Sequence, residues 1–266
     1  MVVASKSRLD WAMKGDKNTR YFHTRASSRQ CRNFMNSLLV NGLLLEEPSM
    51  VRAEVFRYFN QVFSEDWRSR PQLRGHFRSI GQGHLVDGLE AVFSEEEAWV
   101  AIHSCDGNKT VGPDGFNLAC FQKCWKVFKL EVMQFFKEFH DYGKLVSGVN
   151  NSFITLIPKV DCPISISDYR PISLIGSIYK ILAKVLANRL KKVVPKVIGE
   201  VQLAFLGGRN ILDGVLIANE IVDWWKVNKK KGVILKFNFH KAYDSVSWDC
   251  LLSMMKEFGF GDRWRG

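Results

Sequence analysis

Hydrophobic and polar positions alternate with different periods along this chain, and each period predicts an element. In residues 38–45, apolar residues flank Asn41-Gly42, the dipeptide that fits a two-residue hairpin turn, so this segment predicts a β-hairpin. From residue 51 to residue 63, apolar residues recur at helical spacing and predict an amphipathic helix. Residues 64–91 are polar and rich in Arg and Gly, which predicts a linker or loop.

Helical periodicity dominates the middle of the chain. Ser94 and Glu97 have the spacing of a capping box, which predicts a helix that extends to about residue 104. Longer periodic runs predict helices over residues 117–142 and 177–194. The positions expected to be buried in these two helices are Phe121, Trp125, Phe128, Met133, Phe136, Phe139, Ile178, Ile181, Leu182, Val185, Leu186 and Leu190.

Other segments have the composition of strands. Residues 151–159 and 168–174 predict two paired strands, and the Pro residues at their ends favour an exposed hairpin. The apolar, partly β-branched residues 232–235 predict a buried strand that ends near residues 238–240. An amphipathic helix over residues 211–225 precedes this strand, and Ser247 is the expected N-cap of a helix that follows it.

Composition narrows the class of protein and of partner. Hydrophobic residues make up 46% of the 266 residues, enough to exclude a wholly disordered chain. A net charge of +11 favours a polyanionic partner, with nucleic acid as the first candidate and a basic surface without a specific partner as the alternative. Six scattered Cys and the lack of a secretory leader or a long apolar run predict an intracellular protein, in the nucleus or cytoplasm, with no membrane contact.

The basic charge is dense near the start of the chain. Between Lys6 and Arg32 there are eight Lys or Arg against two Asp, with Trp11, Tyr21 and Phe22 interleaved. Cations between aromatic residues suit a phosphate backbone with stacked bases, although a solvated helix face has a similar pattern.

Residues 236–248 read Lys-Phe-Asn-Phe-His-Lys-Ala-Tyr-Asp-Ser-Val-Ser-Trp. This segment resembles the first catalytic motif of the reverse transcriptases of non-LTR (LINE-type) retrotransposons, in the form common in plants. The resemblance implies a metal-binding Asp at position 238, an aromatic residue at Tyr243 that screens the sugar 2′ position of the nucleotide, and a closing Asp244. Position 238 is Asn instead, next to Phe239 in the catalytic motif, and His240 stands where Glu is usual.

The amide at position 238 changes the expected chemistry. Two Mg²⁺ ions need bridging carboxylates, and a neutral amide oxygen neither bridges them well nor offsets their repulsion. The family's second motif, an aromatic residue followed by paired Asp, is also missing, because the chain contains no Asp-Asp dipeptide. We therefore expect no productively bound Mg²⁺ and no polymerisation, even with Asp restored at position 238.

Other motifs extend the resemblance over most of the chain. Residues 112–115, Gly-Pro-Asp-Gly, match a signature that precedes the fingers, and residues 202–210 match a Gln-x-x-Phe…Gly-Arg motif beside the templating base. The residues that the resemblance assigns to nucleotide binding are Lys159, Arg170 and Tyr243. Those that it assigns to template or primer binding are Gln202, Phe205, Arg209, Lys184 and Arg189, the last two on a helix whose outer face is expected to be basic.

The resemblance also implies a fold and partners. We expect an α+β chain, mostly helical with short antiparallel strands, forming the fingers and a truncated palm of a right-hand polymerase. A basic extension with a hairpin would occupy residues 1–91, and the polymerase domain residues 92–266. The expected partners are an RNA template, a DNA primer and, in an intact relative, deoxynucleoside triphosphates. The alternatives are a non-catalytic RNA- or DNA-binding remnant and a non-functional pseudogene product.

Overall fold

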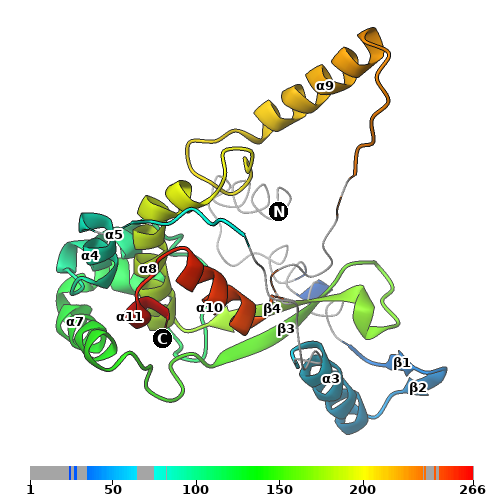
Figure 1. Ribbon diagram of the computed structural model, residues 1–266. Coiled ribbons are helices and arrows are strands. Elements are labelled where there is room, and N and C mark those ends of the chain that lie inside the picture. Colours follow the sequence, from blue (N-terminus) through cyan, green and yellow to red (C-terminus); the bar gives the residue numbers. More distant parts are fainter. Residues whose placement is uncertain are drawn as a thin grey trace. The chain divides into compact units, whose positions relative to one another are not determined.

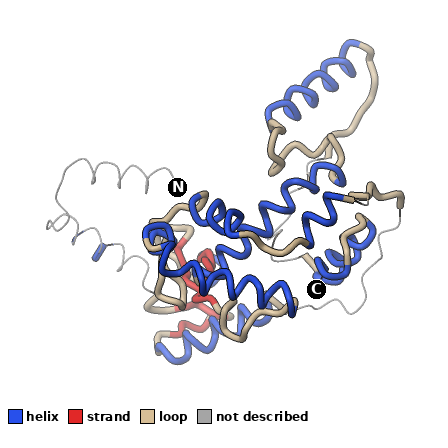
Figure 2. The backbone as a smooth tube through the Cα atoms, turned by 90° about the vertical axis from the view of Figure 1, so that its left-hand side faces the viewer, coloured by secondary structure: helices blue, strands red, loops and turns tan. Residues whose placement is uncertain are grey.

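The computed structural model describes residues 24, 27–28, 35–64, 75–81, 83–235, 237, 243 and 246–265. These residues are mostly helical, and their strands are confined to two hairpins (Figure 2). The chain forms two compact units. Unit 1 combines Met1–Val62 with Ile154–Ser173, and unit 2 combines Phe63–Phe153 with Leu174–Gly266. The expectation of a mostly helical α+β chain with short strands is confirmed, and the domain boundary at residue 91 stays a prediction.

The first hairpin of unit 1 forms as predicted. Strands β1 (Leu38–Val40) and β2 (Leu43–Leu45) pair antiparallel in the register Leu38–Leu45. Asn41 and Gly42 turn the chain with φ values of 50° and 83°. A two-residue turn of this hand needs positive φ at both positions, which Asn and Gly adopt at low cost.

Helix α3 (Pro48–Val62) follows this hairpin and confirms the predicted amphipathic helix. Pro48 suits the first helical position because its missing N–H would have no partner there. The Glu47 carboxylate accepts a hydrogen bond from the Met50 N–H at 3.1 Å. Val51 and Phe59 are the buried residues of the helix.

The second hairpin also agrees with its prediction. Strand β3 (Ser152–Pro158) pairs with β4 (Tyr169–Ile175), with a short 3₁₀ helix, η1 (Ile166–Asp168), between them (Figure 1). The Lys159 N–H donates to the Asp168 carbonyl at 2.7 Å, which closes the connecting loop.

The main core of unit 2 lies between α5 (Glu95–His103), α6 (Leu118–Lys123), α7 (Trp125–Tyr142) and α8 (Ser177–Val197). The capping box is present, since the Glu97 N–H donates to the Ser94 hydroxyl and the Ser94 N–H donates to the Glu97 carboxylate. The buried side chains of this core are Phe93, Ala98, Ala101, Ile102, Leu118, Phe121, Trp125, Val132, Phe136, Ile181, Leu182 and Val185.

The single helix predicted over residues 117–142 is in fact two. Cys124 interrupts it with φ −112° and ψ 30°, between α6 and α7. The apolar period continues across the break because Phe121 and Trp125 both face the core. The sequence around Cys124 contains no Gly or Pro, so the pattern had no signal of the interruption.

A second core forms from part of the predicted linker, since its residues 84–90 are helical whereas residues 75–81 form no helix or strand. Within residues 64–91, helix α4 (His84–Glu90) packs with α10 (Trp248–Glu257), α11 (Asp262–Arg265) and the end of α8. Its buried residues are Ile80, Leu89, Val193, Val197 and Phe260. Gly83 at the N-cap and Gly88 inside α4 weaken the helical signal of this segment, and the burial of Leu89 compensates for that weakness. The predicted N-cap Ser247 is confirmed by its hydrogen bond from the Cys250 N–H.

Helix α9 (Ile211–Val227) forms as predicted, but none of its residues is buried. The strand predicted to follow it does not form in residues 232–235, where Val233, Ile234 and Leu235 are exposed. A strand is stable only when its backbone pairs with a neighbour, and no described segment pairs with this one. None of the described helices is long and apolar enough to cross a membrane.

Candidate nucleic-acid interface

The two cations predicted to bind nucleotide lie at the end of the second hairpin. Lys159 follows β3, Arg170 is the second residue of β4, and both side chains are exposed. The Lys159 ammonium donates to the Ser167 carbonyl at 2.6 Å. The Ser165 and Ile164 N–H groups hold the pKa of the Asp168 carboxyl below its ordinary value. This carboxylate lies between the two cations in the sequence.

The motif predicted to lie beside the template forms the loop between α8 and α9. Phe205 is 92% exposed and has a positive φ of 66°. The Gln202 side-chain amide donates to the Ala204 carbonyl at 3.2 Å, within the same loop. Arg209 is half-buried and donates to the carbonyls of Gly199 and Gln202 at 2.5 and 2.6 Å. The loop therefore presents its aromatic residue to solvent and turns its Arg inward.

Helix α8 presents part of the predicted basic face. Lys184, Lys191 and Lys192 line a hollow of about 570 Å³ between α5 and α8. The same hollow is lined by Ser94, Glu96, Glu97 and Ser104 from the α5 side. This part of α8 offers several ammonium groups to a phosphate chain.

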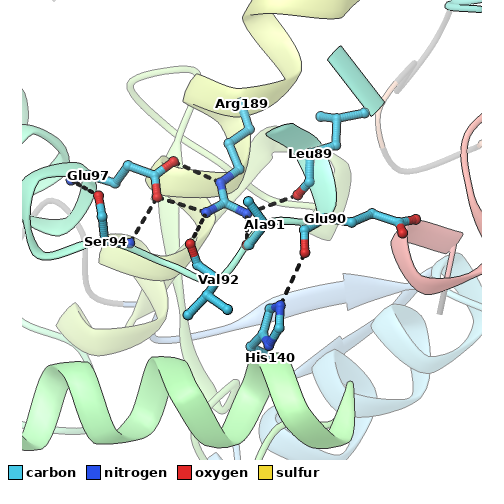
Figure 3. A network of polar contacts seen from close by, with 8 residues as sticks. All are labelled: Leu89, Glu90, Ala91, Val92, Ser94, Glu97, His140 and Arg189. Atoms are coloured by element: carbon cyan, nitrogen blue, oxygen red, sulfur yellow. Dashed lines mark hydrogen bonds and ion pairs between the residues drawn. The ribbon is translucent and has the colours of Figure 1, made fainter. Parts of the chain in front are cut away.

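Arg189 does not belong to that exposed face, contrary to the prediction. Its side chain is 4% exposed, and Figure 3 shows that it points into a cage of oxygens. Nε and Nη2 donate to the two Glu97 carboxylate oxygens at 2.8 and 2.7 Å. Nη1 and Nη2 also donate to the carbonyls of Leu89, Ala91 and Val92. A guanidinium bound in this way has no free edge for a template or primer phosphate.

The Phe93 ring completes the environment of Arg189. The guanidinium carbon lies 4.3 Å from the centre of that ring. Burial pushes the pKa of Glu97 upward, but the hydrogen bonds from Arg189 and the Ser94 N–H outweigh it and hold this pKa below its ordinary value. The periodicity of α8 could not reveal this role, because a buried Arg needs an acidic partner that lies 92 residues away in sequence.

The Gly-Pro-Asp-Gly segment has a structural role that the sequence did not reveal. Asp114 accepts a hydrogen bond from the Ser177 N–H at the start of α8, whose own N-cap, Gly176, has no side chain. The buried Ser177 hydroxyl donates to the Phe116 carbonyl at 2.7 Å. A Cβ at Gly112 would collide with the backbone at Ile175, so Gly is required by this close approach. The signature therefore acts as a remote cap for α8.

The predicted catalytic motif is mostly outside the described residues, which include neither Asn238 nor Phe239 nor Asp244. Tyr243 is described and is 84% exposed.

Comparison with known proteins shows a similarity to reverse transcriptases over part of the chain. Residues 157–265 match the family model of reverse transcriptase (RNA-dependent DNA polymerase). This reverse-transcriptase-like segment covers less than half of the chain and begins within β3. It confirms the predicted resemblance at the level of the reverse transcriptases. The "Transposon TX1 uncharacterized 149 kDa protein" of Xenopus laevis is 24% identical over 272 residues. The alignment covers 98% of this chain and 20% of that protein, so the chain spans about a fifth of the relative's length.

The reverse-transcriptase-like segment contains the predicted nucleotide and template residues as well as position 238. Position 238, where the resemblance implies a metal-binding carboxylate, offers a neutral amide oxygen, which is a poor bridging ligand for two Mg²⁺ ions. Within the part of the chain that the structure describes, no three His, Cys, Asp or Glu side chains form a group that could hold a metal ion. The Asp114 cap and Glu97 lie before the segment, and each bonds to a residue within it.

Proposed function

We propose that this chain is part of the reverse transcriptase of a non-LTR, LINE-type retrotransposon, and that it binds nucleic acid without copying it. The observation that carries the proposal is the match of residues 157–265 to the reverse transcriptases. The similarity to a transposon-encoded protein of Xenopus laevis supports the same origin. On this proposal the second hairpin belongs to the fingers, and residues 232–265 belong to the first part of the palm.

Charge and exposure support nucleic-acid binding. Lys159 and Arg170 are exposed on one hairpin, and separately Lys184 contributes to the basic hollow beside α8. Arg offers a forked contact to phosphate and Lys a point charge. Phe205, exposed at the tip of its loop, suits stacking on a base of the template. The proposed ligand is therefore an RNA strand or an RNA–DNA hybrid.

The residue at position 238 argues against polymerisation by this chain. Nucleotidyl transfer depends on metal positioning and charge stabilisation, which carboxylates provide. Asn238 replaces one carboxylate, and no Asp-Asp pair occurs among the 266 residues to supply the others. We propose that Mg²⁺ is not held productively by this chain.

Primer extension tests the catalytic half of the proposal. The chain is incubated with a primed RNA template and deoxynucleoside triphosphates, in Mg²⁺ and separately in Mn²⁺. We expect no template-dependent incorporation by the unaltered chain or by Asn238→Asp, since the variant still lacks paired Asp residues. Incorporation above that of a heat-denatured sample by the unaltered chain would refute the proposed inactivity.

The salt dependence of RNA affinity tests the proposed nucleic-acid binding. We expect the affinity for RNA to fall steeply as salt rises, because phosphate contacts release counterions. The Lys159→Ala, Arg170→Ala double variant should bind more weakly, whereas the Lys126→Ala, Lys137→Ala double variant on α7 removes two exposed charges elsewhere as a matched control. Affinity that does not change with salt would count against nucleic-acid binding. A chain that lacks a cooperative thermal transition would instead favour a non-functional product.

A further inference from the structure

The Arg209 side chain, in the loop between α8 and α9, donates hydrogen bonds to backbone carbonyls of that loop and of the end of α8. Its Nη1 donates to the Gly199 and Gln202 carbonyls at 2.5 and 2.6 Å, and its Nη2 donates to the Ile198 carbonyl at 3.3 Å. Ile198 is the C-cap of α8. A cation that binds carbonyls at a helix C-terminus is stabilised by the helix dipole as well as by the hydrogen bonds. The guanidinium of Arg209 thus donates hydrogen bonds within the protein itself.

The rest of the loop is arranged around these bonds. The Gln202 N–H donates to the Gly199 carbonyl, and the Arg209 N–H donates to the Leu206 carbonyl, at 3.2 and 3.4 Å. The loop also rests on α9, where an added Cβ at Gly214 would meet the Leu203 side chain at 2.8 Å. Arg209 therefore joins both ends of a compact loop whose tip lies between them.

Phe205 at that tip is held in an unfavourable state. A non-Gly residue at positive φ is strained, and an exposed ring gains nothing from burial in this chain. Such a conformation persists only when surrounding bonds impose it. The Arg209 bonds are the strongest candidates, since they are charge-assisted and flank the tip.

We infer that Arg209 is a positioning residue, which fixes the loop so that Phe205 projects, and does not itself contact phosphate. Recognition of a nucleobase by Phe205 rests on the proposed function. The three hydrogen bonds by which Arg209 holds the loop, here called the clamp, do not rest on it. The clamp requires the fork of Arg, because one side chain must reach three carbonyls. Lys has the charge of Arg without its fork, so Arg209→Lys separates the two requirements.

Chymotrypsin cleavage of the full chain tests the clamp without nucleic acid. The rate of cleavage after Phe205 is followed by mass spectrometry in the unaltered chain, Arg209→Met, Arg209→Lys and the control Lys126→Met on α7. Cleavage reports the population of the opened loop. We expect both Arg209 variants to be cut about tenfold faster and the control to be unchanged. Equal rates in the unaltered chain and Arg209→Met would overturn the inference.

Binding to a single-stranded RNA dodecamer at several salt concentrations tests how Arg209 acts. A positioning residue predicts weaker binding by Arg209→Met at every salt concentration, with an unchanged slope of log affinity against log salt. Arg209→Lys should not restore the affinity. A phosphate contact instead predicts a slope smaller by about 1 and rescue by Lys, which would overturn the inference. If the unaltered chain binds no RNA, the proposed function fails while the cleavage rates still decide the role of Arg209.

Discussion

The buried pair of Arg189 and Glu97 makes a sharp prediction about stability. Glu97→Gln keeps the size of the side chain and one carbonyl oxygen, and Gln also completes a capping box with Ser94. The substitution therefore removes the negative charge while the helix cap is retained. Arg189, with 4% of its side chain exposed, would remain charged without its acidic partner.

The size of the loss follows from the burial of the two partners. Removal of one partner from a fully buried ion pair costs about 3–5 kcal/mol. Two features reduce this value, since the Glu97 side chain is 30% exposed and Arg189 keeps three backbone carbonyls as acceptors. We expect the free energy of unfolding to fall by about 2–3 kcal/mol in Glu97→Gln. The control Glu96→Gln, at an exposed position in the same helical turn, should cost about 0.5 kcal/mol or less.

Urea denaturation followed by circular dichroism measures both losses, and pH gives a second check. The folded-state pKa of Glu97 is below its ordinary value of 4.5, so the carboxylate contributes its full stability above that pH. This contribution is lost as pH falls through the lowered folded-state pKa. The difference between the unaltered chain and Glu97→Gln should therefore be constant at neutral pH and shrink below about pH 4.5. Equal losses for Glu97→Gln and Glu96→Gln, or a difference unaffected by acid, would refute the reasoning.

Three further predictions use other parts of the chain. Asp114→Ala should lower the free energy of unfolding by about 2 kcal/mol because α8 loses its remote cap. The control Asp106→Ala affects only a local turn and should cost less. Equal losses in urea melts would contradict the role of Asp114 as a cap. Gly42→Ala should cost about 1 kcal/mol through backbone strain alone, because no atom lies within 4 Å of an added methyl group; an unchanged melt would contradict this. Lys159→Ala with Arg170→Ala should reduce the salt slope of RNA binding by about 2, and an unchanged slope would place the phosphate contacts elsewhere.

Local signals in the sequence were sufficient for most elements. Asn41-Gly42 fixed the first hairpin, Ser94 with Glu97 fixed the start of α5, and Ser247 fixed the start of α10. These predictions succeeded because a turn, a capping box and an N-cap each depend on atoms only a few residues apart. The resemblance to reverse transcriptases was also readable, since it depends on the order of residues, and the match over residues 157–265 confirms it at the level of the reverse transcriptases.

Predictions that needed a distant partner were less secure. Helix α4 was missed because its helical signal is weak and its stability comes from packing against α8. The strand expected over residues 232–239 does not form in its described residues 232–235, because an apolar run pairs only when a neighbouring strand is present.

The sequence by itself determined the basic charge, the hairpins, most helix starts and the amide at position 238, because each of these is a property of a residue or of its near neighbours. Only the tertiary structure decided which cations are available. Arg189 and Lys184 lie five residues apart on one helix and both border the hollow beside α5, yet the Arg189 side chain is buried against Glu97 whereas Lys184 is only half-buried. Arg209, whose motif predicts a template contact, likewise bonds to three carbonyls, which the sequence did not indicate. A charge is free to meet a ligand only where folding has not already given it a partner.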